Sequence, residues 1–423
     1  MTAADQHEGV KSRKALIFTS LGHFTNDGTI FFIPLIIDLL AVAGRVTPLF
    51  ITLSLTIFYA SMALSAILLG PLIDRRSLQV RGMALGIMSL SVGLLLFSVA
   101  IYGVAIYFFL ILSSVVTGFG ASFYHPTGSS ILQAEYRGPR LGRYLGINGS
   151  AGSLGRALYP TLLLLVSLLF VSHFYSVAFF GILGLIFSLV IFLGMRGYNL
   201  IAHENAHENS AASAQPDGKG KTPSSSRAIT PAIILLAAIS MMRAFAFFGI
   251  ITWIPEYISF ERGIGTSLTL GTTLTLMFSG GIIGQLFFGK LVENHDKRAV
   301  LAISTMLSAL LMFLYLSTAG DVALAMLIMF GFFNFSGFPI FMSMISDYVP
   351  KKGSTTMSNA IVWNLGGTGG QALGPLITGV IIQGAYSNLP IAFEILLLCA
   401  IAAALISLKL PRPAKISKVK LFG

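Results

Sequence analysis

The motif Gly70-Pro71-Leu72-Ile73-Asp74-Arg75-Arg76 follows a long apolar stretch in the first half of the chain. A weaker copy, Gly289-Lys290-Leu291-Val292-Glu293, follows a similar stretch in the second half, 219 residues later. Asn148 and Asn364, each within an apolar stretch, are separated by a similar offset of 216 residues. Matching features at nearly constant offsets predict a chain built from two related halves.

The composition of the chain excludes most soluble proteins. Of its 423 residues 55% are apolar and only 10% are charged, and the mean hydropathy is +0.83. Soluble domains carry about 25% charged residues. A soluble globule cannot cover so much apolar surface with so few charges, so we expect a membrane protein. A cytosolic enzyme and a disordered regulator are therefore excluded, and the single Cys399 excludes a disulfide scaffold.

The apolar stretches are long enough to cross a bilayer as helices, which takes about 20 residues each. Uninterrupted runs of Leu, Ile, Phe, Ala and Gly favour helices over a membrane β-barrel, whose strands show a weaker alternating pattern. We therefore predict an all-α membrane protein. Its twelve transmembrane helices are expected at residues 15–40, 48–72, 79–101, 104–132, 142–166, 169–195, 231–255, 267–291, 299–318, 322–346, 357–384 and 389–409.

Basic residues predict the orientation of these spans. Most of the 27 Lys and Arg residues lie in the amino-terminal tail, in every second connection and in the carboxyl-terminal tail. Lys and Arg mark the cytoplasmic side of a membrane protein. We therefore expect a multi-pass protein of the cytoplasmic (inner) cell membrane with both termini in the cytoplasm. The topology explains the formal charge of +11, so a nucleic-acid partner is not needed.

A polar segment at residues 197–230, rich in Ala, Ser, Asn and Lys, interrupts the apolar pattern and is typical of a flexible linker. It divides the chain into an amino-terminal bundle of six helices at 1–196 and a carboxyl-terminal bundle of six helices at 231–423. We predict that the two bundles are pseudo-symmetric and that the basic tail is part of the second domain.

Two sets of six spans, with the motif after span 2 and its copy after span 8, resemble the major facilitator superfamily over nearly the whole chain. Within it, His23-Phe24-Thr25-Asn26-Asp27 in span 1 resembles the fosmidomycin-resistance branch of efflux proteins. Gly118-Phe119-Gly120-Ala121-Ser122-Phe123-Tyr124-His125-Pro126 in span 4 resembles the same branch. The resemblance implies a proton-driven exporter whose spans 1 and 7 line a central cavity.

A carboxylate near the middle of span 1, Asp27, is the strongest candidate functional group. An ionised side chain at membrane depth costs at least about 2 kcal/mol and usually has a function. His23 lies one turn before Asp27, and His125 in span 4 is expected at a similar depth. We predict that Asp27 carries protons and that both histidines relay them. The alternatives are a fixed ion pair that only locks helices together, and histidines that never change protonation.

Two arginines are also predicted near the middle of the membrane, Arg156 in span 5 and Arg243 in span 7. The offset of 216 residues places Arg243 at a depth matching that of Asp27. A guanidinium is always charged and binds carboxylate or phosphonate through two donors, so we predict that both arginines bind an anionic substrate. Asn26 and Tyr124 are further candidate substrate-binding residues. Alternatively, Arg156 or Arg243 only pairs with Asp27.

The glycines of span 5 recur at every third residue, and span 11 is similarly rich in glycine. Small residues let helices approach closely, which the rocking of two bundles requires, although close packing without a role in coupling explains the pattern equally well. The recurring glycines of span 5 are Gly146, Gly149, Gly152 and Gly155.

The repeated motif has a predicted role of its own. A carboxylate at the cytoplasmic end of a span can bind the amino terminus of a helix in the opposite bundle when that end closes. Charges that only set the orientation of the spans in the membrane would explain the two arginines. They would not explain the spacing of Gly70, Leu72 and Asp74. We therefore predict a cytoplasmic gate formed by Gly70, Asp74, Arg75, Arg76 and Glu293.

No cofactor is predicted, and the proton gradient is the expected energy source. The sequence His203-Glu204-Asn205-Ala206-His207 matches a zinc-protease pattern, but it lies in the polar linker without an evident third ligand. We therefore predict no metal site. The sequence contains no phosphate-binding Walker motif, so nothing in it supports ATP as the energy source.

The sequence thus predicts a secondary active transporter and not an enzyme. We expect a monomeric proton-coupled antiporter that exports a small drug-like, anionic or amphiphilic compound by alternating access. One alternative is a proton-coupled importer of an anionic metabolite, which would use the same residues. The other is a receptor or intramembrane enzyme without transport, which a duplicated chain does not favour.

Overall fold

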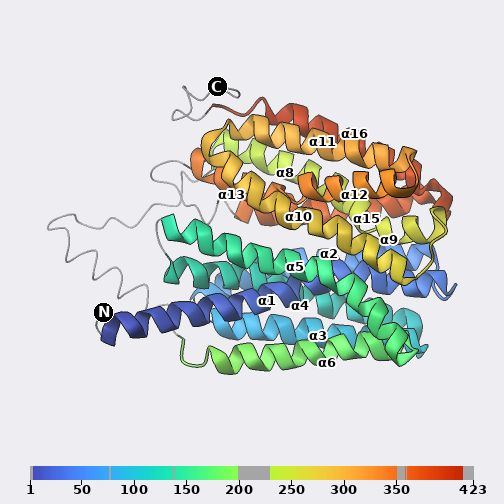
Figure 1. The fold of residues 1–423 in the computed structure, drawn as a ribbon, viewed down its shortest axis with the longest axis horizontal. Coiled ribbons are helices and arrows are strands. Elements are labelled where there is room, and N and C mark those ends of the chain that lie inside the picture. Colours follow the sequence, from blue (N-terminus) through green and yellow to red (C-terminus); the bar gives the residue numbers. More distant parts are fainter. Residues whose placement is uncertain are drawn as a thin grey trace.

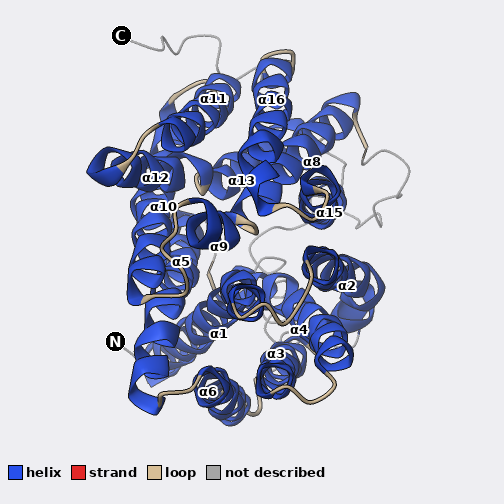
Figure 2. Ribbon diagram, turned by 90° about the vertical axis from the view of Figure 1, so that its right-hand side faces the viewer, coloured by secondary structure: helices blue, strands red, loops and turns tan. Residues whose placement is uncertain are grey.

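The computed structural model describes residues 3–75, 78–136, 139–198, 229–349, 358 and 360–412. The described part of the chain is helical, without β-strands, and the long helices run side by side (Figures 1 and 2). Within it, twelve helices are long and apolar enough to cross a membrane, at positions that match the sequence-based spans. The predicted fold class, an all-α membrane protein with twelve spans, is therefore confirmed.

Six long helices precede the polar segment. They are α1 (Ala3–Val42), α2 (Pro48–Arg75), α3 (Gln79–Tyr102), α4 (Ile106–Glu135), α5 (Pro139–Phe170) and α6 (His173–Gly194). Figure 1 shows them together in the lower part of the molecule.

The spans that follow the polar segment are more often interrupted. Span 7 is made of α8 (Pro231–Ile251), the short α9 (Ile254–Glu256) and the π-helix η2 (Tyr257–Glu261). Span 11 begins as a second π-helix, η3 (Ala360–Thr368), and π-helical turns are common at functional sites. The other elements are α10 (Leu268–Asn294), α11 (Lys297–Ser317), α12 (Gly320–Asn334), α13 (Gly337–Tyr348), α15 (Gly369–Ile382), η4 (Tyr386–Asn388) and α16 (Leu389–Ser407).

The two groups of six spans meet along two pairs of helices. Figure 2 shows α5 beside α10 and α2 beside α15, and both pairs are in close contact. The beginning of α1 and the end of α16 lie at one end of the molecule, which we call the terminal end (Figure 1). We call the opposite end, where α1 ends and α2 begins, the far end.

The contacts between the two groups are closest toward the far end. The hydroxyl of Thr161 on α5 lies 2.6 Å from that of Thr275 on α10, and Thr275 donates to the carbonyl of Ala157 at 2.5 Å. At the far end of the other pair, a Cβ on Gly379 of α15 would lie 2.0 Å from the Thr52 hydroxyl of α2. This packing closes the space between the two groups at the far end.

Glycines bring span 5 against span 1 and span 11 against span 7 in the same way. A Cβ on Gly155 of α5 would lie 2.1 Å from the backbone carbonyl oxygen of Phe24 on α1. A Cβ on Gly370 of α15 would lie 2.4 Å from the carbonyl oxygen of Met241 on α8. Any larger residue at these positions would push the helix backbones apart, so the glycines set how closely α5 approaches α1 and α15 approaches α8.

We predict that Gly155→Ala destabilises the protein, because the new methyl group meets backbone that a rotamer change cannot move. Overpacking of this kind costs about 1–3 kcal/mol. The measurement is the thermal unfolding midpoint of the purified protein in detergent. Gly146→Ala is the matched control on the same helix, because a Cβ there has no neighbour within 4 Å. Equal midpoints for the two variants would contradict the close contact at Gly155.

Candidate functional site

A cavity lies between the two groups of helices, and it holds about 160 Å³ of internal space. A water molecule takes up about 30 Å³ in the liquid, so this cavity can hold several waters or the polar part of a small solute. Its wall includes Asp27 and Phe31 of α1 but no residue beyond Phe31 on that helix. On α8 it likewise ends at Phe248. The cavity therefore extends from mid-depth toward the terminal end and not to the far end.

Asp27 lies in the wall of this cavity with its side chain almost fully buried. One carboxylate oxygen, Oδ2, accepts a hydrogen bond from Arg156 of α5 in a buried ion pair and lies 3.3 Å from Nε2 of His23. The other, Oδ1, accepts from the amide of Asn26 at 3.1 Å and lies 3.5 Å from Nε2 of His125. The structure thus brings the three predicted proton-coupling residues together and adds Arg156 to them.

The hydrogen bond made by the second ring nitrogen of His23, Nδ1, determines where a neutral His23 carries its proton. Asn148 of α5 directs its amide nitrogen to the hydroxyl of Thr19, whose own proton goes to a backbone carbonyl. The amide oxygen of Asn148 is therefore the atom that lies 2.9 Å from Nδ1 of His23, and Nδ1 must carry a hydrogen to bind it. In a neutral His23, Nε2 would then carry no hydrogen and would place its lone pair against the Asp27 carboxylate. An attractive contact requires one further proton between Nε2 of His23 and Oδ2 of Asp27.

Two predicted substrate-binding residues lie behind this cluster and not in the cavity wall. Tyr124 is buried against α1, where its hydroxyl lies 2.9 Å from the Thr19 carbonyl and 3.0 Å from the Asn148 amide oxygen. Its ring stacks on His23 with 4.6 Å between the centroids. Asn26 is fully buried and bonds to Asp27. In this conformation Tyr124 and Asn26 orient His23 and Asp27.

Arg156 is held between polar and aromatic groups. Besides its bond to Asp27, it donates from Nη2 to the hydroxyl of Ser153 at 2.6 Å. The guanidinium carbon lies 5.3 Å from the ring centre of Phe31 and 5.2 Å from that of Phe335, within the range of cation–π contacts. Phe335 belongs to the second group of helices, so Arg156 joins the two groups at the cavity.

Arg243 lines the same cavity from α8, but no acidic side chain among the described residues pairs with it. Its Nε donates to the hydroxyl of Thr305 at 3.1 Å, and Nη2 donates to the carbonyl of Asn334 at 2.5 Å. Its guanidinium lies over the ring of Phe247 at 5.1 Å. Nη1 has no hydrogen-bond partner in the part of the chain that the structure describes, so it can still donate to a ligand.

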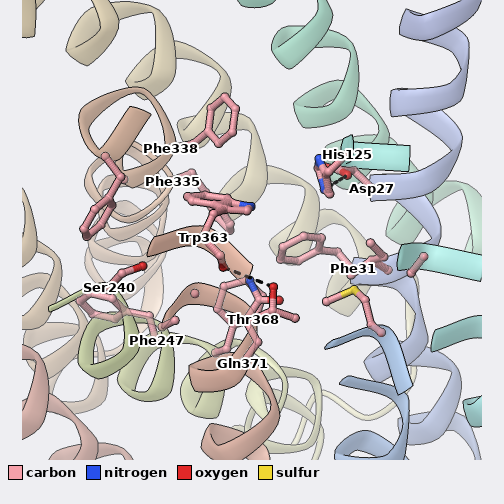
Figure 3. Close-up of a pocket in the computed structure, with 18 of the residues that line it drawn as sticks. Asp27, Phe31, His125, Ser240, Phe247, Phe335, Phe338, Trp363, Thr368 and Gln371 are labelled. Atoms are coloured by element: carbon pink, nitrogen blue, oxygen red, sulfur yellow. Dashed lines mark hydrogen bonds and ion pairs between the residues drawn. The ribbon is translucent and has the colours of Figure 1, made fainter. Parts of the chain in front are cut away.

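Aromatic side chains that the sequence pattern does not distinguish form much of the remaining wall. Figure 3 shows Phe31 on the same side of the cavity as Asp27 and His125, and a group of aromatic rings across from them. The rings of Phe338 and Trp363 meet edge to face at 5.1 Å. These residues resemble ordinary apolar residues of a span, so only the folded structure distinguishes them. The wall also includes Phe247, Phe248, Phe335 and Phe341.

The donor atoms of His23, Asp27 and His125 all lie within 4.8 Å of one another, which is close enough to hold a metal ion. Two imidazoles and a carboxylate suit zinc or another divalent transition metal. However, Arg156 already pairs with Asp27, and its positive charge opposes a divalent cation at this place. The arrangement therefore suits a proton better than a metal.

The structure describes none of the side chains of the predicted gate. Gly70, Asp74 and Arg75 belong to the last two turns of α2, and Glu293 belongs to the last turn of α10. Arg76 lies outside the described residues, and the side chains of the other four are not described either. The gate therefore stays a prediction.

Comparisons with known proteins agree with this architecture. The family model described as Major Facilitator Superfamily matches residues 16–370 and 265–422. A bacterial homolog of the human lysosomal transporter Spinster, solved in an inward-facing and occupied conformation, has a TM-score of 0.71 at 14% identity, over 96% of this chain and 97% of that one. The peptide transporter POT in complex with sulfate has a TM-score of 0.68 at 15% identity, over 94% of both chains. No curated protein matches the sequence.

The two solved structures share the fold of this chain at identities too low to indicate a substrate. The family match covers nearly the whole sequence and includes the helices that carry Asp27, Arg156 and Arg243. The chain therefore belongs to the major facilitator superfamily, and it is a membrane transporter and not an enzyme.

Proposed function

We propose that this transporter couples the movement of its substrate to protons by antiport and exports the substrate from the cell. The observation that carries the proposal is the contact between His23 and Asp27, whose hydrogen-bond partners leave room for one further proton between Nε2 and Oδ2. His125 lies 3.5 Å from the same carboxylate, and its side chain is 39% exposed in the cavity. A proton can thus pass between Asp27 and the water of the cavity through His125.

The cavity wall favours an anionic, amphiphilic substrate. Nη1 of Arg243 is a charged donor without a partner among the described residues, and it lies beside the aromatic wall that contains Phe247 and Trp363. A carboxylate or phosphonate would bind the guanidinium, while an apolar or aromatic portion would pack on the rings. This class of substrate agrees with the resemblance to the fosmidomycin-resistance branch.

Arg156 provides the link between substrate and proton. Its guanidinium neutralises Asp27 in this structure and also lies in the cavity wall, where a bound anion can reach it. An anion that takes over Arg156 leaves Asp27 without its counter-charge, which favours protonation of Asp27. A proton that binds Asp27 in turn releases Arg156 for the anion. Anion and proton therefore favour each other's binding through one guanidinium, so antiport requires that the transporter changes conformation with either one bound but not with both.

We predict that Asp27→Asn abolishes proton-driven transport, because asparagine has no carboxylate to bind the proton. The measurement is uptake of fosmidomycin, or of another phosphonate or carboxylate that binds, into proteoliposomes with an imposed pH gradient. Transport should fall to the level of liposomes without protein. Glu394→Gln is the control, because Glu394 is an exposed carboxylate of α16 that does not line the cavity. Undiminished pH-driven transport by Asp27→Asn would remove Asp27 from the mechanism.

The same liposomes test the direction of coupling. Antiport predicts that substrate moving down its own gradient drives protons the opposite way, which a pH-sensitive dye inside the vesicles records. Proton movement in the same direction as the substrate would instead identify a symporter. Because both mechanisms use one cavity, the sign of this flux decides between export and import.

We predict that Arg243→Ala weakens the binding of an anionic ligand about 10- to 150-fold, the equivalent of the 1.5–3 kcal/mol of a charge-assisted hydrogen bond. Binding of a neutral analogue should change little. Affinities for matched carboxylate and amide compounds, measured by calorimetry on the purified protein, give the comparison. Equal losses for the two compounds would show that Arg243 only braces Thr305 and Asn334.

A further inference from the structure

A second pair of acidic side chains lies at the far end, well away from the Asp27 cluster. Asp38 is one turn before the end of α1, and Glu256 is the last residue of α9. Both side chains have no exposed surface. The α1 helix packs against both α9 and η2, so the pair lies where the first group of helices meets the second.

Most of the oxygens of this pair have no hydrogen-bond partner. Oδ2 of Asp38 accepts from the hydroxyl of Ser259 on η2 at 2.8 Å. Among the described residues, Oδ1 of Asp38 and both oxygens of Glu256 have none. Ser259 lies three residues after Glu256, so its bond to Asp38 brings the two acidic residues to neighbouring turns of packed helices.

No cation compensates these carboxyl groups in the described part of the chain. Tyr386 belongs to η4, which packs against η2, and it carries no positive charge. The two arginines near this end are bound elsewhere. Arg45 donates to the carbonyl of Ile101, and Arg262 donates to the carbonyls of Tyr315 and Thr318.

Two ionised carboxylates cannot remain in these surroundings. An unpaired buried charge costs several kcal/mol, and two like charges in contact cost more. Asp38 has the hydroxyl of Ser259 to stabilise its charge, whereas no other residue among those described donates to Glu256. A protonated Glu256 avoids the buried charge, so the closed far end favours at least one bound proton.

We propose that Asp38 and Glu256 form a second proton-binding site, which holds the far end of the transporter closed when protonated and lets it open when deprotonated. Separation of α1 from α9 would admit water to both carboxyl groups and allow them to ionise. The closed state therefore binds more protons than the open state. By linkage, a rise in pH favours opening, by up to about tenfold in the closed-to-open ratio per pH unit for each proton.

The experiment measures the opening of the far end directly, in the full-length protein in lipid nanodiscs. Spin labels are attached at Val104→Cys, between α3 and α4, and at Thr269→Cys, at the start of α10, in a Cys399→Ser background. Electron–electron distance measurements then follow the closed population as pH rises from about 5 to about 8. We expect the short-distance population to fall as pH rises.

The double variant Asp38→Asn/Glu256→Gln keeps the shape of both side chains but removes their charge. Its far end should stay closed across the whole pH range. Glu394→Gln, which changes an exposed carboxylate of α16 outside both sites, should keep the pH response of the unmodified protein. Because the readout is conformation and not transport, a failure of the coupling proposed for Asp27 would leave this result unaffected.

Three outcomes would overturn the proposal. The first is an unchanged pH response in the double variant, and the second is an equal loss of the pH response in Glu394→Gln. The third is a distance change at constant pH when sodium replaces choline in the buffer, which would identify a metal-cation site. Size-exclusion chromatography of each variant shows that it is folded before the distances are compared.

Discussion

The arrangement of the first group of helices depends on one buried carboxylate. Asp27 lies at membrane depth, where an ionised group without partners would cost several kcal/mol, so its partners must reach it from two other helices. Arg156 and Asn148 are on α5 and His125 is on α4, and each needs α1 to pack closely. The glycines of span 5 permit that approach. The contacts of Asp27 and the close packing of α1 on α5 therefore depend on each other.

This dependence explains why the sequence indicated so much of the site. A charge stands out in an apolar span, so Asp27, Arg156 and Arg243 are recognisable from the order of amino acids alone, and the repeat predicted matching depths for Asp27 and Arg243. Hydropathy was sufficient to locate the twelve helices, because a bilayer requires about 20 apolar residues in each. What periodicity could not indicate is which of many similar phenylalanines face the cavity. That depends on how the helices are rotated against one another.

Asp38 and Glu256 were missed for a different reason. Both lie near the ends of their spans, where charged residues are ordinary and usually contact water. Only the folded structure shows that the far end is closed over them and that their oxygens are left without donors. Asn148 was noticed as part of the repeat, but its role follows from the two hydrogen-bonding directions of its amide, which a sequence does not contain.

The two acidic sites lie at different depths, and alternating access gives this separation a physical meaning. In the present conformation the cavity reaches Asp27 from the terminal end while Asp38 and Glu256 are sealed at the other. If the terminal end is cytoplasmic, as the basic residues predict, protons from outside meet the Asp38–Glu256 pair only when the far end is open. Their binding would then favour closure and return the transporter to the conformation seen here. Acidification outside would thus favour the resetting step, whereas the gradient itself supplies energy only through protons that cross the membrane at Asp27, because the Asp38–Glu256 pair meets water on one side alone.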